Sequence, residues 1–374
     1  MKIAYIFHPG RLKRFDEASA GNAATEFFYG ALELRARGHD ISCYELGDLA
    51  GKLTIDQFFL QLMYKAGLMP PKAHPVLFQQ VMRLVPVLHP FDIVIGTESG
   101  IAFALAATRL RKKWCSTLIG IHCGFLHHYQ SKMNVYLTGF LFSQMYSCLF
   151  GEGEKPVIQK RYKVPDESVE VIPFGVDTKF WRPDEGPHDK YPYILAVGND
   201  FQRDYTLLIE AARLVNMKIK VITEREIPAD IPSNVEVIRG SYRSAGLSDL
   251  QLRELYRKAL FTAIPLKPSF QPSGQSVALQ SMACGTPVLI TQTAGLWDHH
   301  YLRDMENIVF IHTNKPEEWA KTIDRITADH ELLKRLSAAA CQYVSVHGQI
   351  ERFADRLEQL CLTLPRKRSN CQSR

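Results

Sequence analysis

Residues 272–288 read Pro-Ser-Gly-Gln-Ser-Val-Ala-Leu-Gln-Ser-Met-Ala-Cys-Gly-Thr-Pro-Val, and this stretch decides the fold more than any other part of the chain. It opens as a small-residue turn at 272–276, continues as a short helix, and passes through Gly285-Thr286-Pro287 into the apolar strand 288–290. A glycine-bearing turn that opens a helix is a ready anion site, because unpaired backbone N–H groups and the helix dipole point at the same spot. Strand, turn, helix and strand form the unit of nucleotide-binding α/β folds, although an ordinary αβ crossover uses glycine in the same way.

The same stretch resembles the donor-site signature of the GT-B glycosyltransferases of the GT4 type. In that family a Glu, seven residues and a second Glu precede Met-Ala-x-Gly-x-Pro-Val, which stands here at 282–288. This register places Gln280 at the second Glu and Pro272 at the first, so both carboxylates are absent. The segment 174–183, Phe-Gly-Val-Asp-Thr-Lys-Phe-Trp-Arg-Pro, is similar to the inter-domain segment of the family, with Phe174 in place of an Asn.

Length and composition bound the class of protein. At 374 residues the chain exceeds the size that one core usually serves, so we expect two domains. A hydrophobic content of 46% with 22% charged residues is typical of a globular protein. Nowhere do about 18 apolar residues follow one another, so no transmembrane helix is expected. The apolar run 2–7 is a first strand rather than a signal peptide, which predicts a cytoplasmic chain.

Charge and cysteine content exclude several kinds of site. The formal net charge of +6 implies a mild attraction to anions, but no nucleic-acid motif accompanies it, so no nucleic-acid partner is expected. The eight cysteines form no Cys-x-x-Cys pair, so we expect reduced thiols and neither a zinc site nor a disulfide framework. Basic residues gather at 109–113 and at 366–368. Such runs are usually solvated helix ends or chain termini, and for 109–113 a contact with an anionic membrane surface is the alternative.

Strands and helices alternate along both halves of the chain. The apolar strands of the first half are 2–7, 40–46, 91–96 and 116–121, and those of the second half are 193–198, 219–222, 235–239, 261–265, 288–290 and 308–311. This alternation predicts an α/β fold with two doubly wound, Rossmann-like parallel sheets. The resemblance implies the GT-B architecture, with an acceptor-side domain at 1–183, a donor domain at 184–346, a helix crossing back to the first domain at 347–364, and a basic tail at 365–374.

Three further stretches of the first half read as helical. Residues 53–88 are rich in Phe, Leu and Met and are interrupted at Met69-Pro70-Pro71, while residues 127–150 are rich in aromatic residues. Core packing explains these residues, and so does an apolar acceptor groove or a membrane-facing patch. Residues 23–37 read as an amphipathic helix that follows a polar loop running through Gly21.

Two cations are candidates for holding a diphosphate. Arg203 lies in the loop 198–205, which leaves an apolar strand and opens a helix, and Lys267 lies in a second loop that precedes the signature. The family directs cations of the first loop at the diphosphate, so the resemblance gives that role to Arg203, while Asn199 takes a position where the family has Arg. In the alternative reading Arg203 is a helix-start residue paired with Asp200 or Asp204, and Lys267 is a solvent-exposed lysine.

The signature and its neighbours offer further contacts to a donor. Backbone N–H groups of Gly274, Gln275 and Ser276 can meet the phosphates or the donor sugar. Gln280 can still bond ribose hydroxyls, because an amide both donates and accepts hydrogen bonds. The resemblance also places Gly240, at a strand end, where the family reads the nucleobase.

Two residues of the first half are candidates through the same resemblance. Gly21, in Ser19-Ala20-Gly21-Asn22, takes the place of a glycine-rich loop that approaches donor and acceptor. His122 follows the strand 116–121 and matches a histidine that family members place against the transferred sugar. An ordinary small-residue turn and a strand-end histidine bonded to backbone are the alternatives. Glu98, which follows another strand, either lines the cleft or caps the next helix.

These residues together predict a glycosyltransferase that moves a hexose-type sugar from a nucleotide-diphosphate sugar to a glycan or lipid-linked acceptor. No Asp-x-Asp occurs in the chain, and the resemblance implies a retaining transfer that needs neither a metal nor another cofactor. Two other readings stay open. The missing Glu pair favours a catalytically inactive GT-B scaffold, and a nucleotide-sugar epimerase shares the architecture but relies on carboxylates in the cleft.

Overall fold

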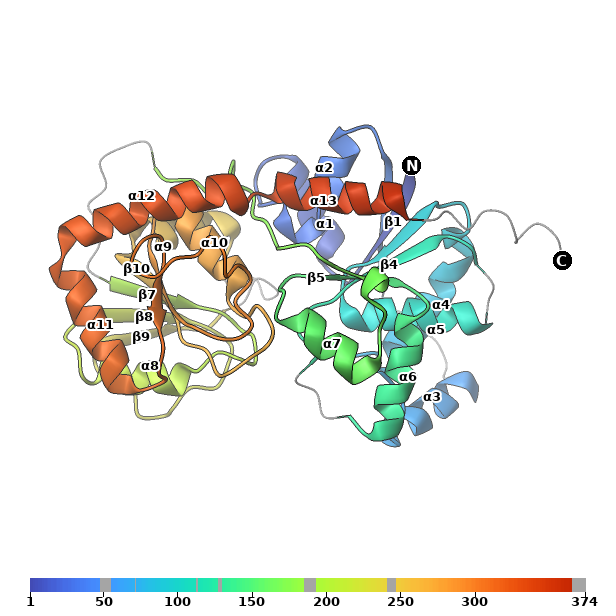
Figure 1. The fold of residues 1–374 in the computed structure, drawn as a ribbon, viewed down its shortest axis with the longest axis horizontal. Coiled ribbons are helices and arrows are strands. Elements are labelled where there is room, and N and C mark those ends of the chain that lie inside the picture. The colour runs from blue at the N-terminus through green and yellow to red at the C-terminus, as the bar shows by residue number, and fades with distance from the viewer. Residues whose placement is uncertain are drawn as a thin grey trace. The chain divides into compact units, whose positions relative to one another are not determined.

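The computed structural model describes residues 1–47, 55–70, 72–111, 114–126, 130–184, 193–240 and 247–364 of the chain. The chain forms two compact units, each built around one sheet (Figure 1). The first unit contains residues 1–16, 28–173 and the chain from 353 onward, and the second contains residues 17–27 and 174–352. The sequence placed the boundary at 183 and did not foresee that residues 17–27 belong with the second unit.

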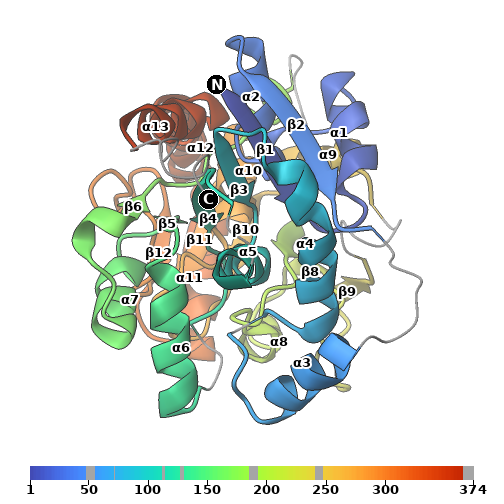
Figure 2. The ribbon, with the colours of Figure 1, turned by 90° about the vertical axis from the view of Figure 1, so that its right-hand side faces the viewer.

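The first unit is a six-stranded parallel sheet with helices on both faces (Figure 2). Its strands are β1 (Lys2–Phe7), β2 (Asp40–Glu45), β3 (Ile93–Gly96), β4 (Thr117–Ile121), β5 (Tyr146–Leu149) and β6 (Val169–Val171), in the order β2-β1-β3-β4-β5-β6. Its helices are α1 (Arg11–Ser19), α2 (Ala31–Ala36), α3 (Ile55–Lys65), α4 (Pro75–Leu88), α5 (Ser99–Arg111), α6 (Lys132–Phe142), α7 (Glu154–Tyr162) and α13 (Ile350–Thr363), with short 3-10 turns at Glu26–Phe28 and Asp166–Ser168.

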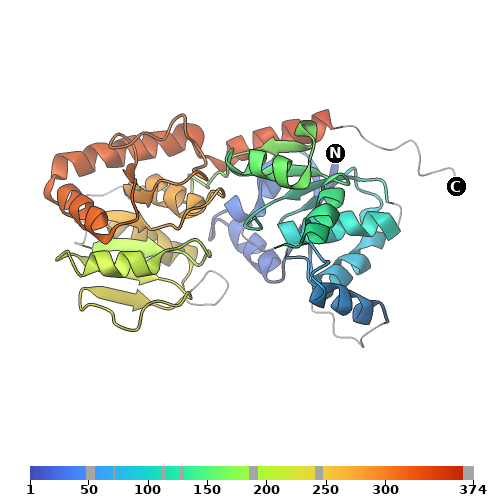
Figure 3. The same cartoon turned by 60° about the horizontal axis from the view of Figure 1, so that its bottom comes forward.

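The second unit repeats this plan with a second six-stranded parallel sheet (Figure 3). Its strands are β7 (Tyr193–Val197), β8 (Lys218–Ile222), β9 (Val235–Ile238), β10 (Phe261–Ile264), β11 (Val288–Thr291) and β12 (Val309–Ile311), in the order β12-β11-β10-β7-β8-β9. Its helices are α8 (Tyr205–Ala212), α9 (Asp249–Lys258), α10 (Gln275–Ala283), α11 (Pro316–Ala328) and α12 (His330–His347). The prediction of two doubly wound parallel sheets is therefore confirmed.

Apolar strands and amphipathic helices explain why each unit has its own core. The residues of β3, β10 and β11 are buried throughout, as the near-continuous apolar runs of a sheet covered on both faces require. The core of the first unit packs α4 and α5 against its sheet, and the core of the second packs α8, α11 and α12 against its own.

The last helix, α13, belongs to the first unit from Phe353 onward, although the chain from 174 to 352 belongs to the second. Ala354 packs against Gly30, where an added Cβ would meet the Ala354 Cβ at 3.3 Å, and Gly30 has the positive φ of 80° that favours glycine. Glu358 accepts hydrogen bonds from Arg37 at 2.7 Å and from His39 at 2.5 Å. These contacts show the C-terminal helix crossing back to the first unit.

Two helix predictions in the first half are wrong in part. The polar residues after β1 form helix α1, and the predicted helix 23–37 is a 3-10 turn followed by the short α2. The predicted helical stretch 127–150 contains α6 and then the strand β5. The buried Ser147 and Cys148 show that a strand covered on both faces lacks the alternating pattern that identifies strands in sequence.

The described residues show the state of most cysteines and whether any helix could cross a membrane. Cys43, Cys123, Cys148, Cys284, Cys341 and Cys361 are free thiols. Cys115 is disulfide-bonded, so the expectation of reduced thiols is wrong at that position. No helix within the described residues is both long enough and apolar enough to cross a bilayer. The basic tail 366–368, the pair His127-His128 and Lys112-Lys113 of the basic cluster lie outside the described residues.

The backbone at Gly175 generates a prediction about stability. Val176 pairs with Gln349 in an isolated bridge, and a Cβ at Gly175 would lie 2.2 Å from the Gln349 carbonyl oxygen. We expect Gly175→Ala to lower the free energy of unfolding by about 1–3 kcal/mol, the usual cost of overpacking. Thermal melting checks this, with Gly47→Ala as control because a Cβ at Gly47 meets nothing within 4 Å. Equal melting midpoints for the two variants would contradict the prediction.

Candidate functional site

The strand order of the second sheet defines where a ligand binds. β7 is the first strand of this sheet, and the later strands β8 and β9 lie on one side of it while β10, β11 and β12 lie on the other. The strand order therefore reverses between β7 and β10. In open α/β sheets ligands bind outside the carboxyl ends of the strands at such a point. A ligand site is therefore expected at the loops that leave β7 and β10.

Arg203 lies in the loop that follows β7, and its side chain is almost completely buried, with 2% of its surface exposed. Its Nε lies 3.0 Å from Oδ2 of Asp200, and its backbone forms an isolated bridge with Leu266 of the loop that follows β10. Its Nη1 has no hydrogen-bond partner within the described residues. The structure therefore shows an ion pair with Asp200, one of the partners that the alternative reading named. It also shows that the buried Nη1 group can still donate hydrogen bonds to a ligand.

Two glycines make room for the Arg203 guanidinium. A Cβ added to Gly198 would lie 2.3 Å from Arg203 Nε, and a Cβ added to Gly274 would lie 2.9 Å from Nη1. Gly274 also has a φ of 81°, which favours glycine. The guanidinium therefore fits against Gly198 after β7 and against Gly274 at the start of α10, and any larger residue at either position would displace it.

Gly274 is the N-cap of α10, and no side chain caps this helix. The first N–H groups of a helix lack intrahelical partners and carry the positive end of its dipole. Arg203 Nη1 adds a cation beside the same turn. A fixed guanidinium and a helix N-terminus together form a site for an anion with several oxygens, such as a phosphate.

Lys267 lies in the loop that follows β10, next to the loop of Arg203. Its backbone N–H donates to the carbonyl of Gln202 at 2.8 Å, and Asp204 N–H donates to Pro265 at 3.0 Å, so the two loops are bonded along their length. The Lys267 side chain is exposed. The structure thus brings Lys267 close to the Arg203 loop without fixing its ammonium, and its contact with a diphosphate stays a prediction.

Asn199 and Gly240 come together at the carboxyl ends of β7, β8 and β9. The Asn199 amide Nδ2 donates to the Gly240 carbonyl at 3.4 Å, and its Oδ1 accepts from Thr223 at 2.9 Å and from the Glu224 N–H at 2.6 Å. A Cβ at Gly240 would meet nothing within 4 Å. Asn199 therefore connects three loops, and none of the described residues fills the space where a Cβ of residue 240 would lie.

Gln275 and Ser276 form the first turn of α10. Gln275 is buried, and its Nε2 has no hydrogen-bond partner within the described residues, while Ser276 is half-buried. Gln275 thus places a second unused donor at the N-terminus that Arg203 faces. Its direct contact with a donor molecule stays a prediction.

Gln280 is engaged by a carboxylate that the sequence did not indicate. Its Nε2 donates to Glu26 Oε1 at 2.8 Å, and its Oε1 accepts from the Tyr256 hydroxyl at 3.3 Å. Glu26 is fully buried and also accepts from Trp181 Nε1 at 2.7 Å and from the Asp177 N–H at 3.3 Å. Burial raises the pKa of Glu26 to about 7 against the opposing hydrogen bonds, the largest of them from Gln280. A ribose contact at Gln280 stays a prediction, because its amide is already bonded within the protein.

The two remaining candidates differ in exposure. Gly21 is exposed with a φ of 76°, in the turn after α1 rather than directly after β1. His122 is fully buried among Phe103, Phe125 and Phe142, with ring centroids 5.2–5.5 Å apart, and neither ring nitrogen has a hydrogen-bond partner within the described residues. Burial lowers the pKa of His122 to about 3. The ring is not open to solvent here, and its contact with a sugar stays a prediction.

Residues 191–329, which include Arg203, Lys267 and the N-terminus of α10, match the family model described as Glycosyl transferases group 1. Over this segment the chain is similar to the group 1 glycosyltransferases. The resemblance that the signature carries is therefore confirmed, although both Glu residues of the signature are missing.

Relatives and solved structures agree with this similarity. The D-inositol 3-phosphate glycosyltransferase of Streptomyces bingchenggensis is 32% identical over 98 residues, which is 26% of this chain and 20% of the relative. The protein of the same name from Nocardiopsis dassonvillei is 24% identical over 229 residues, 53% of this chain and 51% of the relative. The chain thus spans about half, or less, of the length of the curated relatives that it matches.

A solved structure covers the whole architecture. The crystal structure of Anabaena Alr3699/HepE in complex with UDP-glucose matches 97% of this chain and 100% of its own, with a TM-score of 0.70 and 13% identity. At this identity the similarity establishes the fold. The chain therefore has the two-domain GT-B fold that the sequence predicted.

The buried Glu26 generates a prediction about pH. A carboxyl whose pKa is higher in the folded protein than in the unfolded chain destabilises the fold as the pH rises through the interval between the two values. For Glu26 that interval runs from 4.5 to about 7. We expect Glu26→Gln, which keeps an oxygen acceptor for Gln280, to gain about 3 kcal/mol relative to the wild type between pH 5 and pH 8.

Melting curves of the wild type and Glu26→Gln across this pH range measure the difference. Glu17→Gln is the matched control, because Glu17 is exposed in the same segment. A difference between Glu26→Gln and the wild type that stays constant with pH would show that Glu26 does not titrate in this interval.

Proposed function

We propose that the chain is a glycosyltransferase that moves a hexose-type sugar from a nucleotide-diphosphate sugar to a hydroxyl of a glycan or lipid-linked acceptor. The observation that carries the proposal is the buried Arg203 guanidinium against the uncapped N-terminus of α10, at the switch point of the second sheet. This arrangement suits a diphosphate, and it lies in the segment that matches the glycosyltransferase family.

The reaction breaks the bond between the anomeric carbon and the diphosphate, so negative charge develops on the leaving group. Stabilising such charge with groups that are already in place is usually the largest catalytic contribution. Arg203 and the α10 N-terminus are in place before any ligand binds, because Gly198 and Gly274 hold the guanidinium. We propose that these groups, with Lys267 from the adjoining loop, stabilise the negative charge on the leaving diphosphate, as a divalent metal does in other transferases. Following the family resemblance, we propose a retaining transfer.

The relatives support a polyhydroxylated acceptor. Those that match this chain are named as D-inositol 3-phosphate glycosyltransferases, and another is named as a lipopolysaccharide core biosynthesis glycosyltransferase. Inositol and core sugars both present several secondary hydroxyls. We propose an acceptor of this chemical class.

One observation favours a second function, that of an inactive scaffold. The position that matches the second Glu of the signature is Gln280, and its amide is bonded to Glu26 and Tyr256 inside the protein. A scaffold would keep the GT-B fold without using the donor site. Binding of a nucleotide diphosphate at Arg203 separates the two functions.

Replacement of Arg203 tests the donor site. Hydrogen bonds to charged groups contribute about 1.5–3 kcal/mol, so we expect Arg203→Ala to weaken nucleotide binding by roughly 10- to 150-fold. Thermal melting against UDP, GDP, ADP and dTDP, each with and without EDTA, measures the effect, because a ligand that binds the folded state raises the midpoint. We expect a shift with one nucleotide that survives EDTA and is lost in Arg203→Ala.

Arg213→Ala is the control, because Arg213 forms surface ion pairs with Glu210 and Asp230 at the end of α8. No shift with any nucleotide in the wild type would overturn the enzyme and favour the scaffold. A shift that disappears with EDTA would overturn the metal-independent mechanism alone.

Exposed apolar side chains on two helices of the first unit support contact with a membrane surface. On α3 they are Phe58, Phe59, Leu62 and Tyr64, and on α6 they are Met133, Tyr136 and Phe140. Asn134 at the start of α6 donates to the Gly67 carbonyl at 2.9 Å, which holds α6 against the segment after α3. Exposed apolar side chains gathered on a helix in this way are typical of an interaction site. We propose that these helices bring the chain to an anionic membrane that carries a lipid-linked acceptor.

Arg109, the first residue of the basic cluster, is engaged within the first unit. Arg109 packs over the Trp114 ring at 4.5 Å and donates to the Gln144 carbonyl at 2.6 Å. Its guanidinium is therefore used inside the first unit.

Vesicle sedimentation tests whether the exposed apolar side chains of α6 bind a membrane. Burying one large apolar side chain is worth about 1.5–3 kcal/mol, so we expect the double variant Tyr136→Ser, Phe140→Ser to reduce binding to anionic vesicles at least tenfold. Leu214→Ser is the control, because Leu214 is similarly exposed in the second unit. A wild type that fails to sediment with the vesicles at low salt contradicts the proposal.

A further inference from the structure

Residues 17–27 form a short segment that we call the strap. The residues before and after it, 1–16 and 28–173, belong to the first unit, whereas the strap belongs to the second. None of its residues, all of which the structure describes, lies in a strand of the second sheet. Its attachment to the second unit therefore depends on single hydrogen bonds and on side-chain packing.

Glu26 supplies one set of these hydrogen bonds. It is fully buried, and its Oε1 accepts from Gln280 Nε2 at 2.8 Å and from Trp181 Nε1 at 2.7 Å. Its Oε2 accepts from the Asp177 N–H at 3.3 Å. Gln280 lies on α10, while Trp181 and Asp177 lie in the segment that follows residue 174. One carboxyl group thus joins the strap to two separate parts of the second unit.

Two backbone N–H groups of the strap add further hydrogen bonds. The Ala24 N–H donates to Asp249 Oδ2 at 3.1 Å. The Thr25 N–H donates to Asp177 Oδ2 at 3.3 Å. Both acceptors are carboxyl groups, and the strap itself, Glu-Ala-Ser-Ala-Gly-Asn-Ala-Ala-Thr-Glu-Phe, contains no Lys, Arg or His. The surroundings of Glu26 are therefore acidic.

The Glu26 carboxyl has hydrogen-bond donors but no counter-ion, since no ion pair to Glu26 is found within the described residues. The ionisable groups around it are Asp177, Asp249 of α9, and Tyr256 of α9, whose hydroxyl donates to Gln280 at 3.3 Å. Burial raises the pKa of Tyr256 well above its ordinary value, so this hydroxyl stays neutral. The charge of Asp249 opposes the ionisation of Glu26. An ionised Glu26 would thus be a buried anion without a partner, which is costly.

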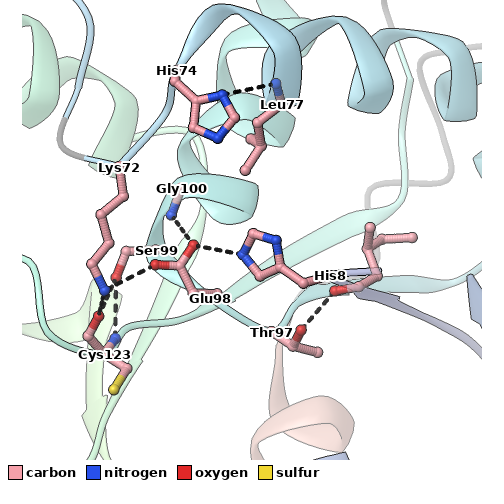
Figure 4. Close-up of polar contacts among 10 residues, drawn as sticks. His8, Lys72, His74, Leu77, Thr97, Glu98, Ser99, Gly100 and Cys123 are labelled. Carbon is pink, nitrogen blue, oxygen red and sulfur yellow. Dashed lines mark hydrogen bonds and ion pairs between the residues drawn. The ribbon is translucent and has the colours of Figure 1, made fainter. Parts of the chain in front are cut away.

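Glu98 of the first unit shows what a counter-ion changes (Figure 4). Its Oε1 lies 3.1 Å from Lys72 Nζ, and its Oε2 lies 3.3 Å from His8 Nε2. Its Oε2 also accepts the Gly100 N–H at 2.8 Å, at the start of α5. Burial alone would raise the pKa of Glu98, but the hydrogen bond from His8 and the charge of Lys72 outweigh it and lower the pKa to about 2. Burial raises the pKa of Glu26 to about 7 against its neutral donors, so Glu26 changes charge in a range where Glu98 stays ionised.

We propose that Glu26 holds the strap on α10, and that ionisation of Glu26 releases the strap from the second unit. A protonated carboxyl still accepts from Gln280 and Trp181 through its oxygens, and it brings no charge into the interior. After the proton is lost, the anion is stabilised by water, which it reaches when the strap leaves α10. No ligand takes part in this change, so it is independent of the proposed function.

The two protonation equilibria of Glu26 determine the pH range of the release. In the released strap Glu26 has its ordinary pKa of 4.5, and in the buried state its pKa is about 7. Below pH 4.5 the carboxyl is protonated in both states, so the strap is held most firmly. Attachment weakens as the pH rises from 4.5 to about 7, and it then stays constant because both states are ionised.

Hydrogen–deuterium exchange of the full chain, followed by mass spectrometry between pH 5 and pH 8, tests the release. Exchange rates are compared with those of an unstructured peptide at the same pH, which removes the intrinsic pH dependence of exchange. The Ala24 and Thr25 amides report on the strap, because both donate to the second unit. We expect their protection to fall roughly 100-fold between pH 5 and pH 7 and then to stay level.

Two variants make the same change of charge at different places in the strap. Glu26→Gln keeps an oxygen acceptor for Gln280 and cannot ionise, so we expect its strap protection to be independent of pH. Glu17→Gln, at an exposed position of the strap, should lose protection as the wild type does. Peptides from β10 and α5 are internal references, since Glu98, which precedes α5, keeps its charge throughout this range.

Four results would overturn the inference. They are wild-type strap protection that does not change with pH, a pH-dependent loss that persists in Glu26→Gln, the absence of that loss in Glu17→Gln, and an equal loss in β10. The last result would show unfolding of the whole second unit instead of release of the strap. Nucleotide binding at Arg203 can succeed or fail independently of all four, because no nucleotide is present during the exchange.

Discussion

The second unit is organised around the close approach of the Arg203 guanidinium to two backbone positions that have no side chain. Gly198 ends the first strand of the sheet, and Gly274 begins α10, so the guanidinium joins the two loops that meet at the switch point. The backbone pairing of Arg203 with Leu266 aligns the same loops. A cation held in this way loses little further conformational freedom when an anion binds, and pre-organisation of this kind favours binding.

A second constraint comes from a segment that lies far away in the sequence. Residues 17–27 belong to the second unit, and the buried Glu26 explains why. Its carboxylate oxygens accept from Gln280, Trp181 and the Asp177 backbone, which come from α10 and from the segment after residue 174. A buried carboxyl is tolerated when its acceptor sites are filled, whereas an acid at position 280 would place two carboxylates side by side. Gln280 is thus the residue that fits beside Glu26, which accounts for one of the two missing acids of the signature.

Elements that depend on a local pattern of apolar residues and glycines could be predicted from the sequence. The apolar run of β10 and the glycine-opened helix α10 were both predicted, and the family resemblance led to Arg203 and Gly274, which the structure brings together. Features that depend on long-range contacts could not be found in this way. Glu26 reads as an ordinary acid near a helix start, because its partners are 151 to 254 residues away. His8 reads as the end of a strand, since only the strand order places it beside Glu98, and the polar pattern of α1 gave no sign of a helix.

The energetics of Arg203 bear on whether the site is used. A buried cation costs free energy unless it is fully paired, and Arg203 is paired on one side only, with the half-exposed Asp200. A scaffold that needed only to fold would be more stable with an apolar side chain between Gly198 and Gly274. The cost is offset when an anion with several oxygens occupies the α10 N-terminus and accepts from the unused donors. The same argument extends to Gln275, whose buried Nε2 also lacks a partner within the described residues. Two unused buried donors at one helix N-terminus are costly in the free protein and useful in a complex, and this favours a chain that binds its donor.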